Sequence, residues 1–158
     1  MSLEQEIGEL LRRKKLTLGT VESATGGLIA SLITDVTGSS DYYLGSVVSY
    51  SNKVKLETVG VSEESMRKFG VVSAQVAQEM AQGGRRLLGV DICLADTGIA
   101  GPGGATLAKP VGLFYVGLAH KDGVSSRRYL FGGDRLQNKH SAATAALGWL
   151  KEYLVSLE

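Results

Sequence analysis

The sequence predicts a three-layer α/β/α sandwich with a mixed, mostly parallel sheet, and three observations support this fold class. Short runs of β-forming residues alternate with amphipathic segments over the first two thirds of the chain, as expected for strands joined by helices. A hairpin signal and one long amphipathic segment close the chain. The length of 158 residues is typical of one domain, and no repeat or linker divides it, so we expect a single domain over residues 1–158.

The first predicted helix begins after Ser2, which has the capping-box spacing to Gln5, and ends in a basic run at residues 12–15. A short strand is predicted at residues 16–21. The turn ESATGG then leads into apolar residues at helical spacing. The free N–H groups at that helix start could bind an anion, or the hydroxyls of Ser23 and Thr25 could simply cap the helix.

The second predicted strand covers residues 42–50, which are rich in β-forming side chains. If a helix begins near Asn52, Lys55 lies about one turn into it and can lean back toward Tyr50 at the strand end. Most lysines are exposed. The local sequence therefore leaves the role of Lys55 open.

Two further helices are predicted, a short one after Ser62 and a longer one capped by Ser73. The apolar stripe of the longer helix consists of Val76, Met80, Leu87 and Leu88. The pair Gly83-Gly84 lowers helical propensity there, which indicates close packing against a neighbour that the sequence does not identify.

A buried strand at residues 91–96 leads directly into the stretch TGIAGPGG at residues 97–104. Half of this stretch is glycine. Repeated glycines let a backbone lie close to a ligand and point its N–H groups inward, although a flexible connection has a similar composition. Both interpretations stay open on the local sequence.

The chain closes with a predicted antiparallel hairpin and a helix. Strands at residues 111–119 and 125–131 flank an Asp-Gly turn, which tolerates positive φ. Asp134 then caps the last helix, with Gln137 at the capping-box position, and its apolar face should pack on the core. The loops at 22–27, 50–55 and 97–104 each follow a strand, so we expect them to converge in one cleft.

Composition argues against several classes of function. The formal net charge is +1, from 17 basic and 16 acidic residues, so we expect neither a nucleic-acid nor a membrane partner. Cys93 is the only cysteine and lies in an apolar run, where a thiol behaves as a small buried hydrophobe. His120 and His140 belong to no metal-ligand cluster. We therefore expect a cytoplasmic protein without a metal or cofactor.

Several motifs together carry a resemblance that covers nearly the whole chain. They are ESATGG at 22–27, GSVVSYSN at 45–52 with Lys55, TGIAGPGG at 97–104 followed by KPVG at 109–112, and GDR at 133–135. In these motifs the sequence resembles the CinA C-terminal domain family. The resemblance implies a mixed-sheet α/β/α fold, a homodimer, and an amidohydrolase that converts nicotinamide mononucleotide to nicotinate mononucleotide and ammonia in pyridine-nucleotide recycling.

The sequence departs from the usual family pattern at two places. Ala24 stands where a cysteine is common, which leaves serine chemistry open and indicates that no thiol is needed. Residues 105–108 replace what is often a Gly-Thr-Pro-Glu type of run, a change that affects the rim of the glycine loop and bears on substrate preference. The additional N-terminal domain of some members is not expected here.

Amide hydrolysis without a metal needs a nucleophile, a proton acceptor and donors for the oxyanion. Carried over from the resemblance, Ser23 is the expected nucleophile, and either Lys55 or Tyr50 is the base. The glycine loop is expected to hold either the phosphate or the oxyanion. The expected substrate-binding residues are Thr25, Gly26, Gly27, Asn52, Thr97, Gly98, Gly101, Gly103, Gly104 and Arg135. The alternative is a nucleotide-binding module of the same fold without catalysis.

Overall fold

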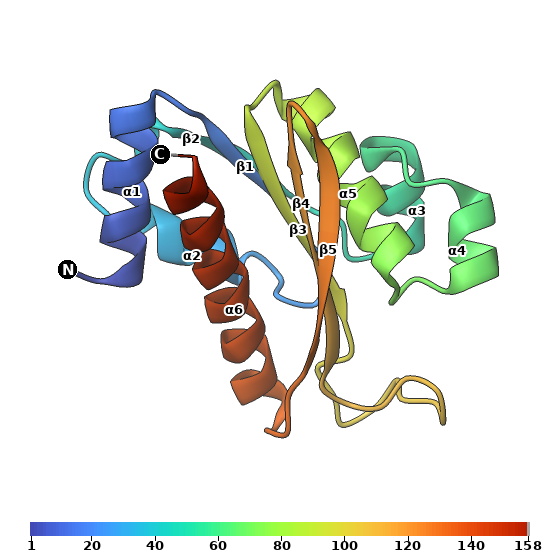
Figure 1. Cartoon of the computed structure of the whole chain (residues 1–158). Helices are drawn as coiled ribbons and strands as arrows, with labels where there is room; N and C mark the ends of the chain where they lie inside the picture. The colour runs from blue at the N-terminus through green and yellow to red at the C-terminus, as the bar shows by residue number, and fades with distance from the viewer. Residues whose placement is uncertain (158) are drawn as a thin grey trace.

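The computed structural model describes residues 1–157, and its elements alternate as expected (Figure 1). A 3-10 turn lies at Ser39–Asp41, and a π-helical turn at Lys55–Val59 directly continues α3. In chain order the helices and strands are α1 (Leu3–Lys14), β1 (Leu18–Glu22), α2 (Leu28–Thr34), β2 (Tyr43–Val48), α3 (Asn52–Val54), α4 (Glu63–Phe69), α5 (Ala74–Leu88), β3 (Ile92–Gly98), β4 (Leu113–His120), β5 (Gly123–Leu130) and α6 (Arg135–Ser156).

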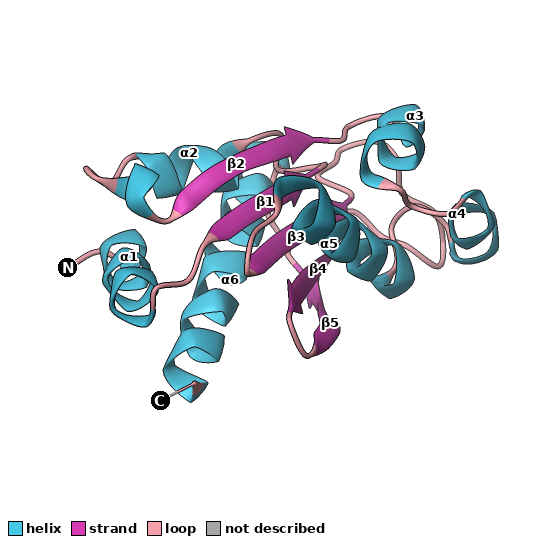
Figure 2. Cartoon of the chain, turned by 90° about the horizontal axis from the view of Figure 1, so that it is seen from above, coloured by secondary structure: helices cyan, strands magenta, loops and turns pink. Residues whose placement is uncertain are grey.

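The sheet has five strands in the order β2-β1-β3-β4-β5, and Figure 2 shows them side by side. β1 pairs in parallel with both β2 and β3, whereas β4 is antiparallel to both β3 and β5. Only β4 therefore opposes the common strand direction. The predicted α/β/α sandwich with a mixed, mostly parallel sheet is confirmed.

Helices cover both faces of the sheet. α1, α2 and α6 lie on one face, and α5 packs on the other with α3 and α4 beyond it (Figure 1). Alternate residues of β3 serve the two cores: Ile92 and Leu94 join the cluster beneath α1, α2 and α6, while Cys93 and Ala95 join the cluster beneath α5. Strand alternation thus sends Asp96 toward α2 and Thr97 toward α5.

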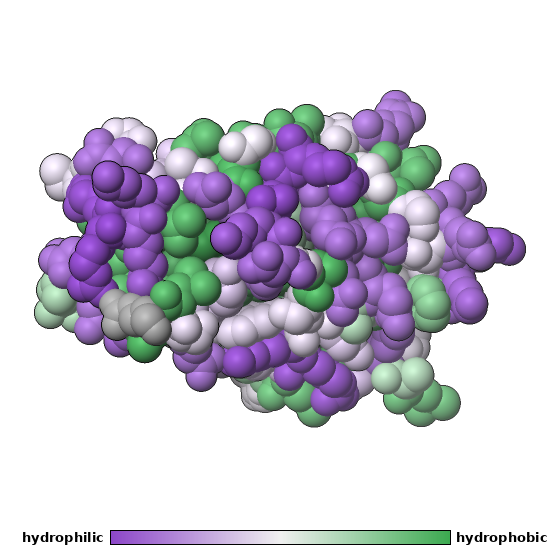
Figure 3. All heavy atoms as spheres, turned by 45° about the horizontal axis from the view of Figure 1, so that its top comes forward, coloured by the Kyte–Doolittle hydropathy of each residue, from purple (hydrophilic) through white to green (hydrophobic). Residues whose placement is uncertain are grey.

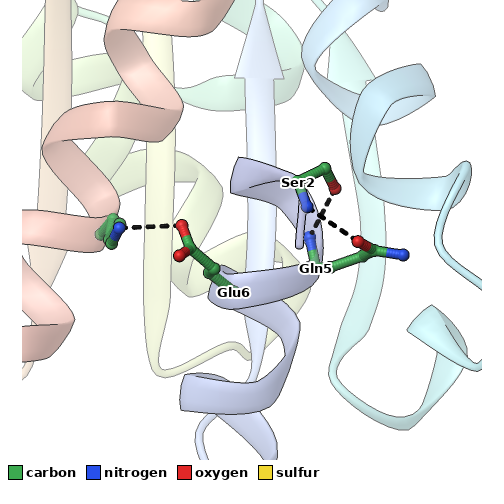
Figure 4. A network of polar contacts seen from close by, with 4 residues as sticks. Ser2, Gln5 and Glu6 are labelled. Carbon is green, nitrogen blue, oxygen red and sulfur yellow. Dashed lines mark hydrogen bonds and ion pairs between the residues drawn. The ribbon is translucent and has the colours of Figure 1, made fainter.

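Local capping signals from the sequence are present in the structure. The side chain of Ser2 accepts from the Gln5 N–H, and the Gln5 side chain accepts from the Ser2 N–H (Figure 4). Asp134 and Gln137 form the same reciprocal pair at the start of α6. These bonds join residues three apart, which is why the sequence predicts them.

The glycine pair in α5 packs against Val59 and Val21. A Cβ on Gly83 would lie 1.9 Å from the carbonyl oxygen of Val59, and one on Gly84 would lie 2.3 Å from Val21. Gly83 therefore permits close packing of α5 against the π-helical turn, and Gly84 permits close packing of α5 against β1 of the sheet. The predicted apolar stripe was wrong at Leu87, which is 52% exposed, because the packed face of α5 lies at Val76, Met80 and the glycines.

Two observed strand ends differ from the predicted ones, and both lie at the loops that were expected to form the cleft. β2 ends at Val48 rather than residue 50, so the carbonyls of Ser49 and Tyr50 are free to accept other donors. β3 continues through Thr97 and Gly98, which pair with β4 and so belong to the sheet rather than to the glycine loop.

The surface mixes hydrophilic and hydrophobic side chains, which are interspersed over the face in Figure 3. Within residues 1–157, no helix is long and apolar enough to cross a membrane. Cys93 is buried as expected, and burial raises the pKa of its thiol to about 12. No cluster of histidine, cysteine and acidic residues suited to a metal occurs in that part of the chain.

Candidate active site

Three loops meet where the parallel strands end. β1, β2 and β3 run in the same direction, so the segments that follow them lie at one edge of the sheet. A cavity of about 310 Å³ opens there. Of the predicted site residues, its walls include Ser23, Tyr50, Asn52, Lys55, Thr97, Gly98, Gly101, Gly103, Gly104 and Arg135. The convergence expected from the sequence is therefore present.

Ser23 and Lys55 are in direct contact at the floor of this cavity. The Lys55 Nζ lies 3.0 Å from the Ser23 Oγ, and Lys55 is only 1% exposed. Two carbonyl oxygens also accept from the Nζ, that of Ser49 at 2.7 Å and that of Tyr50 at 3.2 Å. The π-helical turn that begins at Lys55 brings its side chain back over the end of β2, as the helix spacing predicted.

This geometry suits both protonation states of the amine. An ammonium has three N–H donors, which the three neighbours of Lys55 would accept. A neutral amine has two N–H donors for the carbonyls and a lone pair for the Ser23 hydroxyl. Burial lowers the pKa of Lys55 below its ordinary value, and the carboxylate of Asp96 opposes part of that shift. Lys55 is thus placed to take a proton from Ser23.

Neither alternative left open for the start of α2 is present, because no side-chain hydroxyl caps this helix and its N–H groups are not free for a ligand anion. The carboxylate of Glu22 already accepts from the N–H groups of Gly27, Ile29 and Ala30, at 2.8–3.1 Å. Glu22 is fully buried at the last position of β1, so the chain supplies its own anion to this helix start. A ligand anion has no free donors left there.

Thr25, Gly26 and Gly27 do not line the cavity. The Thr25 hydroxyl lies between two carboxyl groups, 2.7 Å from Glu22 and in hydrogen-bond contact with Asp96. Gly26 and Gly27 have positive φ in the turn, at 63° and 101°. All three residues shape the turn that carries Ser23, and none is placed to touch a ligand in this cavity.

Asp96 is the strongest feature that the sequence did not single out. Its carboxyl is completely buried and accepts from the N–H groups of Ser23 at 3.1 Å and Thr25 at 3.2 Å. Burial raises its pKa to about 6, against the lowering effect of the Thr25 hydroxyl, while the Glu22 charge raises it further. The sequence signal for this role is a charged residue at the end of an apolar strand.

Arg135 and Tyr50 form the opposite wall. The Arg135 guanidinium donates to the carbonyl of Gly101 at 2.9 Å and to the Tyr50 hydroxyl at 3.2 Å. Tyr50 is 63% exposed, and its hydroxyl contacts Arg135 rather than Ser23. Of the two expected bases, only Lys55 is within hydrogen-bond distance of the Ser23 Oγ.

The glycine loop is held by buried donors outside the cavity. The Asn138 side chain donates to the carbonyls of Ala100 and Gly133 and accepts from the Gly133 N–H. Gly98 is required by packing, because a Cβ there would lie 2.3 Å from the Phe114 ring. At Gly103 a Cβ would have open space, so that glycine has no such steric reason.

The Thr97 hydroxyl is already used within the protein. It donates to the carbonyl of Val71 at 3.0 Å, and Val71 and Val72 add an apolar wall to the cavity. Thr97, an expected substrate-binding residue, therefore has no free hydroxyl hydrogen to donate to a ligand. No motif in the sequence places the segment before Ser73 at the site.

The fold and these contacts define a class of α/β/α protein in which a buried serine–lysine pair opens into a glycine-lined cavity at the carboxyl edge of the sheet. The family model described as the CinA C-terminal domain matches residues 1–154. The chain belongs to the CinA C-terminal domain family, as the motifs indicated.

Relatives of known sequence agree with this membership. A putative competence-damage inducible protein of Caldicellulosiruptor saccharolyticus is 45% identical over 155 residues, which cover 98% of this chain and 38% of that protein. One from Halothermothrix orenii is 49% identical over 154 residues, which cover 97% and 37%. The chain thus spans less than two fifths of the length of these relatives.

Solved structures agree as well. A competence-damaged protein (CinA) superfamily protein from Klebsiella pneumoniae is 28% identical with a TM-score of 0.94, covering 98% of this chain and 96% of that one. The competence/damage inducible protein CihA from Agrobacterium tumefaciens is 36% identical with a TM-score of 0.85, covering 92% and 93%. Over nearly all of its described residues, the chain therefore has the fold of this superfamily.

Proposed function

We propose that this protein is an amidohydrolase that converts nicotinamide mononucleotide to nicotinate mononucleotide and ammonia. The observation that carries the proposal is the 3.0 Å contact between the Lys55 Nζ and the Ser23 Oγ in a buried position. A serine hydroxyl needs an adjacent base to act as a nucleophile, and a buried lysine of lowered pKa is such a base. The choice of substrate rests on the family resemblance.

In the proposed first step, the Ser23 Oγ attacks the carboxamide carbon while the Lys55 Nζ accepts the hydroxyl proton. The carbonyls of Ser49 and Tyr50 keep the Nζ oriented throughout. The C–N bond then breaks as Lys55 returns the proton to the leaving nitrogen, which departs as ammonia and leaves an ester on Ser23. Water, deprotonated by the same Nζ, hydrolyses that ester and restores Ser23.

The developing oxyanion needs N–H donors that the fold has not used. Ala24, Gly103 and Gly104 line the cavity, and their N–H groups have no hydrogen-bond partner within residues 1–157. The Ala24 N–H belongs to the residue that follows Ser23 and suits the oxyanion. The N–H groups of the glycine loop then remain for the phosphate.

Arg135 is the proposed charged partner of the phosphate. A guanidinium has five N–H donors, and the contacts to Gly101 and Tyr50 use two of them. The remaining donors lie at the mouth of the cavity that also contains Asn52. The cavity volume of about 310 Å³ lies at the lower end of the range for small-molecule sites, which suits a mononucleotide.

Ammonia release from nicotinamide mononucleotide tests the proposal. The parent chain should be active, and Ser23→Ala and Lys55→Met should each lose about a thousandfold or more in kcat. Lys53→Met is the matched control, because Lys53 is an exposed lysine of the same helical segment and does not line the cavity. Undiminished turnover by Ser23→Ala would refute the nucleophile assignment and leave attack by water.

The second candidate is a nucleotide-binding module without catalysis, which would use the same cavity and Arg135. Tight binding of the mononucleotide without any ammonia release, even at high protein concentration, would favour it. We further propose a cytoplasmic homodimer that binds no nucleic acid. Light scattering at physiological salt, with and without added DNA, tests the dimer and the indifference to DNA.

A further inference from the structure

A second buried carboxyl lies beneath the proposed nucleophile. Asp96, near the end of β3, does not line the cavity and has no exposed surface. One carboxyl oxygen accepts from the Ser23 N–H and the other from the Thr25 N–H. The carboxyl therefore joins β3 to both sides of Ala24 and fixes the turn on which the Ser23 Oγ is carried.

The charge of Asp96 is not neutralised by a close partner. No ion pair of Asp96 with a lysine or arginine occurs among residues 1–157. Two charged groups act on this part of the site: Glu22 on the α2 side, which repels the Asp96 charge, and Lys55 on the β2 side, whose ammonium Asp96 stabilises. Arg135, the first residue of α6, also lines the cavity.

We propose that Asp96 is a positioning residue for the Ser23–Lys55 pair: it fixes the Ser23 turn through two backbone N–H groups, and its charge controls how readily Lys55 releases its proton. This inference rests on the proposed function for its kinetic consequences. Asp96 touches neither the cavity nor the Nζ, so it acts only through these two residues.

The two effects have distinct pH signatures. Because the pKa of Asp96 is about 6, its negative charge is present above pH 6 and disappears below it. That charge holds the pKa of Lys55 higher than burial alone would. Removing the charge therefore lowers the pKa of Lys55, so the neutral amine becomes available at lower pH.

Asp96→Asn is the decisive variant. It removes the charge, and it replaces one carboxyl oxygen by an NH₂ group that must face a backbone N–H in either orientation, because both oxygens accept such groups. We expect kcat on the pH plateau to fall about tenfold with KM changed less than about twofold. The acid limb of the kcat/KM profile should shift to lower pH. At a pH half a unit to one unit below the apparent pKa of the parent's acid limb, the kcat/KM of the variant, taken as a fraction of its own plateau value, should be about threefold that of the parent.

The pH dependence of the difference between parent and variant distinguishes a positioning role from a general loss of structure. The normalised profiles of parent and variant should differ above pH 6 and converge below it, where Asp96 of the parent is itself uncharged. Ser73→Ala is the matched control, since it removes a buried hydroxyl that donates to the Gly70 carbonyl and accepts from the Val76 N–H, and neither of these partners is charged. It should leave the acid limb in place. If the acid limb of the kcat/KM profile of Asp96→Asn stayed at the parent's pH, or shifted to higher pH, the proposal would be overturned.

A second measurement needs neither turnover nor a variant at Asp96. The 13Cε resonance of Lys55 in the uniformly labelled parent, assigned with Lys55→Arg, should show its main titration and a smaller inflection near pH 6 as Asp96 ionises. Absence of that inflection would refute the electrostatic link. If the parent released no ammonia, the proposed function would fail, while this titration would still decide the role of Asp96.

Discussion

The free energy of unfolding should carry a pH-dependent contribution from Asp96 that Asp96→Asn removes. Burial raises the pKa of this carboxyl from an ordinary 3.8 to about 6. The folded chain therefore holds this proton more tightly than the unfolded chain. The stabilisation is complete below the unfolded pKa near 3.8 and is lost as the pH rises through 6.

The magnitude follows from the size of the shift. A raised pKa of about 2 units corresponds to about 3 kcal/mol between the two limits, and about 2 kcal/mol of that falls between pH 4.5 and 7.5. Parent and variant unfolded in urea at several pH values across this window give the difference directly. The stability of Asp96→Asn relative to the parent should improve by about 2 kcal/mol from pH 4.5 to pH 7.5.

Taking the difference in the free energy of unfolding between variant and parent cancels the titration of all other groups. The hydrogen bond lost in the variant changes that difference by the same amount at every pH. Asp122→Asn serves as the control, because Asp122 is exposed in the β4–β5 turn. If the Asp96→Asn difference depended on pH no more than the difference of this control, or fell with rising pH, the buried carboxyl would not hold its proton as described.

Three further predictions follow from the same contacts. Gly84→Ala should destabilise the chain by about 1–3 kcal/mol, because the new methyl group would overlap Val21; an unchanged urea midpoint would contradict the packing. Asn138→Ala should cost about 2–4 kcal/mol in urea unfolding, since it leaves the buried Ala100 carbonyl without this donor and removes the hydrogen bonds to Gly133, and a neutral effect would contradict the burial of that carbonyl. Tyr50→Phe should raise KM for the mononucleotide by about threefold with little change in kcat, whereas a large loss of kcat alone would favour Tyr50 as the base.

Much of the fold could be predicted because its signals are local. The capping pairs of α1 and α6 join residues three apart, and the β4–β5 hairpin turns on adjacent Asp and Gly residues. Strand-following loops meet at one edge of any parallel sheet, so the cavity was expected at the correct edge. The strand ends were less accurate, because pairing with β4 extends β3 through Gly98.

The roles of individual polar residues were harder to predict, because each role depends on a distant partner. The local sequence leaves the helix start after Ser23 open to an anion, but its N–H groups donate to the Glu22 carboxylate. The local sequence also leaves the Thr97 hydroxyl open to a ligand, but it donates to the Val71 carbonyl. In both cases a neighbour within the protein had already taken the donors.

By itself, the sequence determined the fold class, the edge of the sheet where the loops converge, and the family, since periodicity, caps and motifs are written along the chain. Only the tertiary structure decided that Lys55 rather than Tyr50 reaches Ser23, and that the Asp96 carboxyl accepts from the Ser23 N–H. Ser23 and Asp96 are 73 residues apart, and no local pattern encodes their contact. Burial, which lowers one pKa and raises the other, exists only once the sheet and helices have packed.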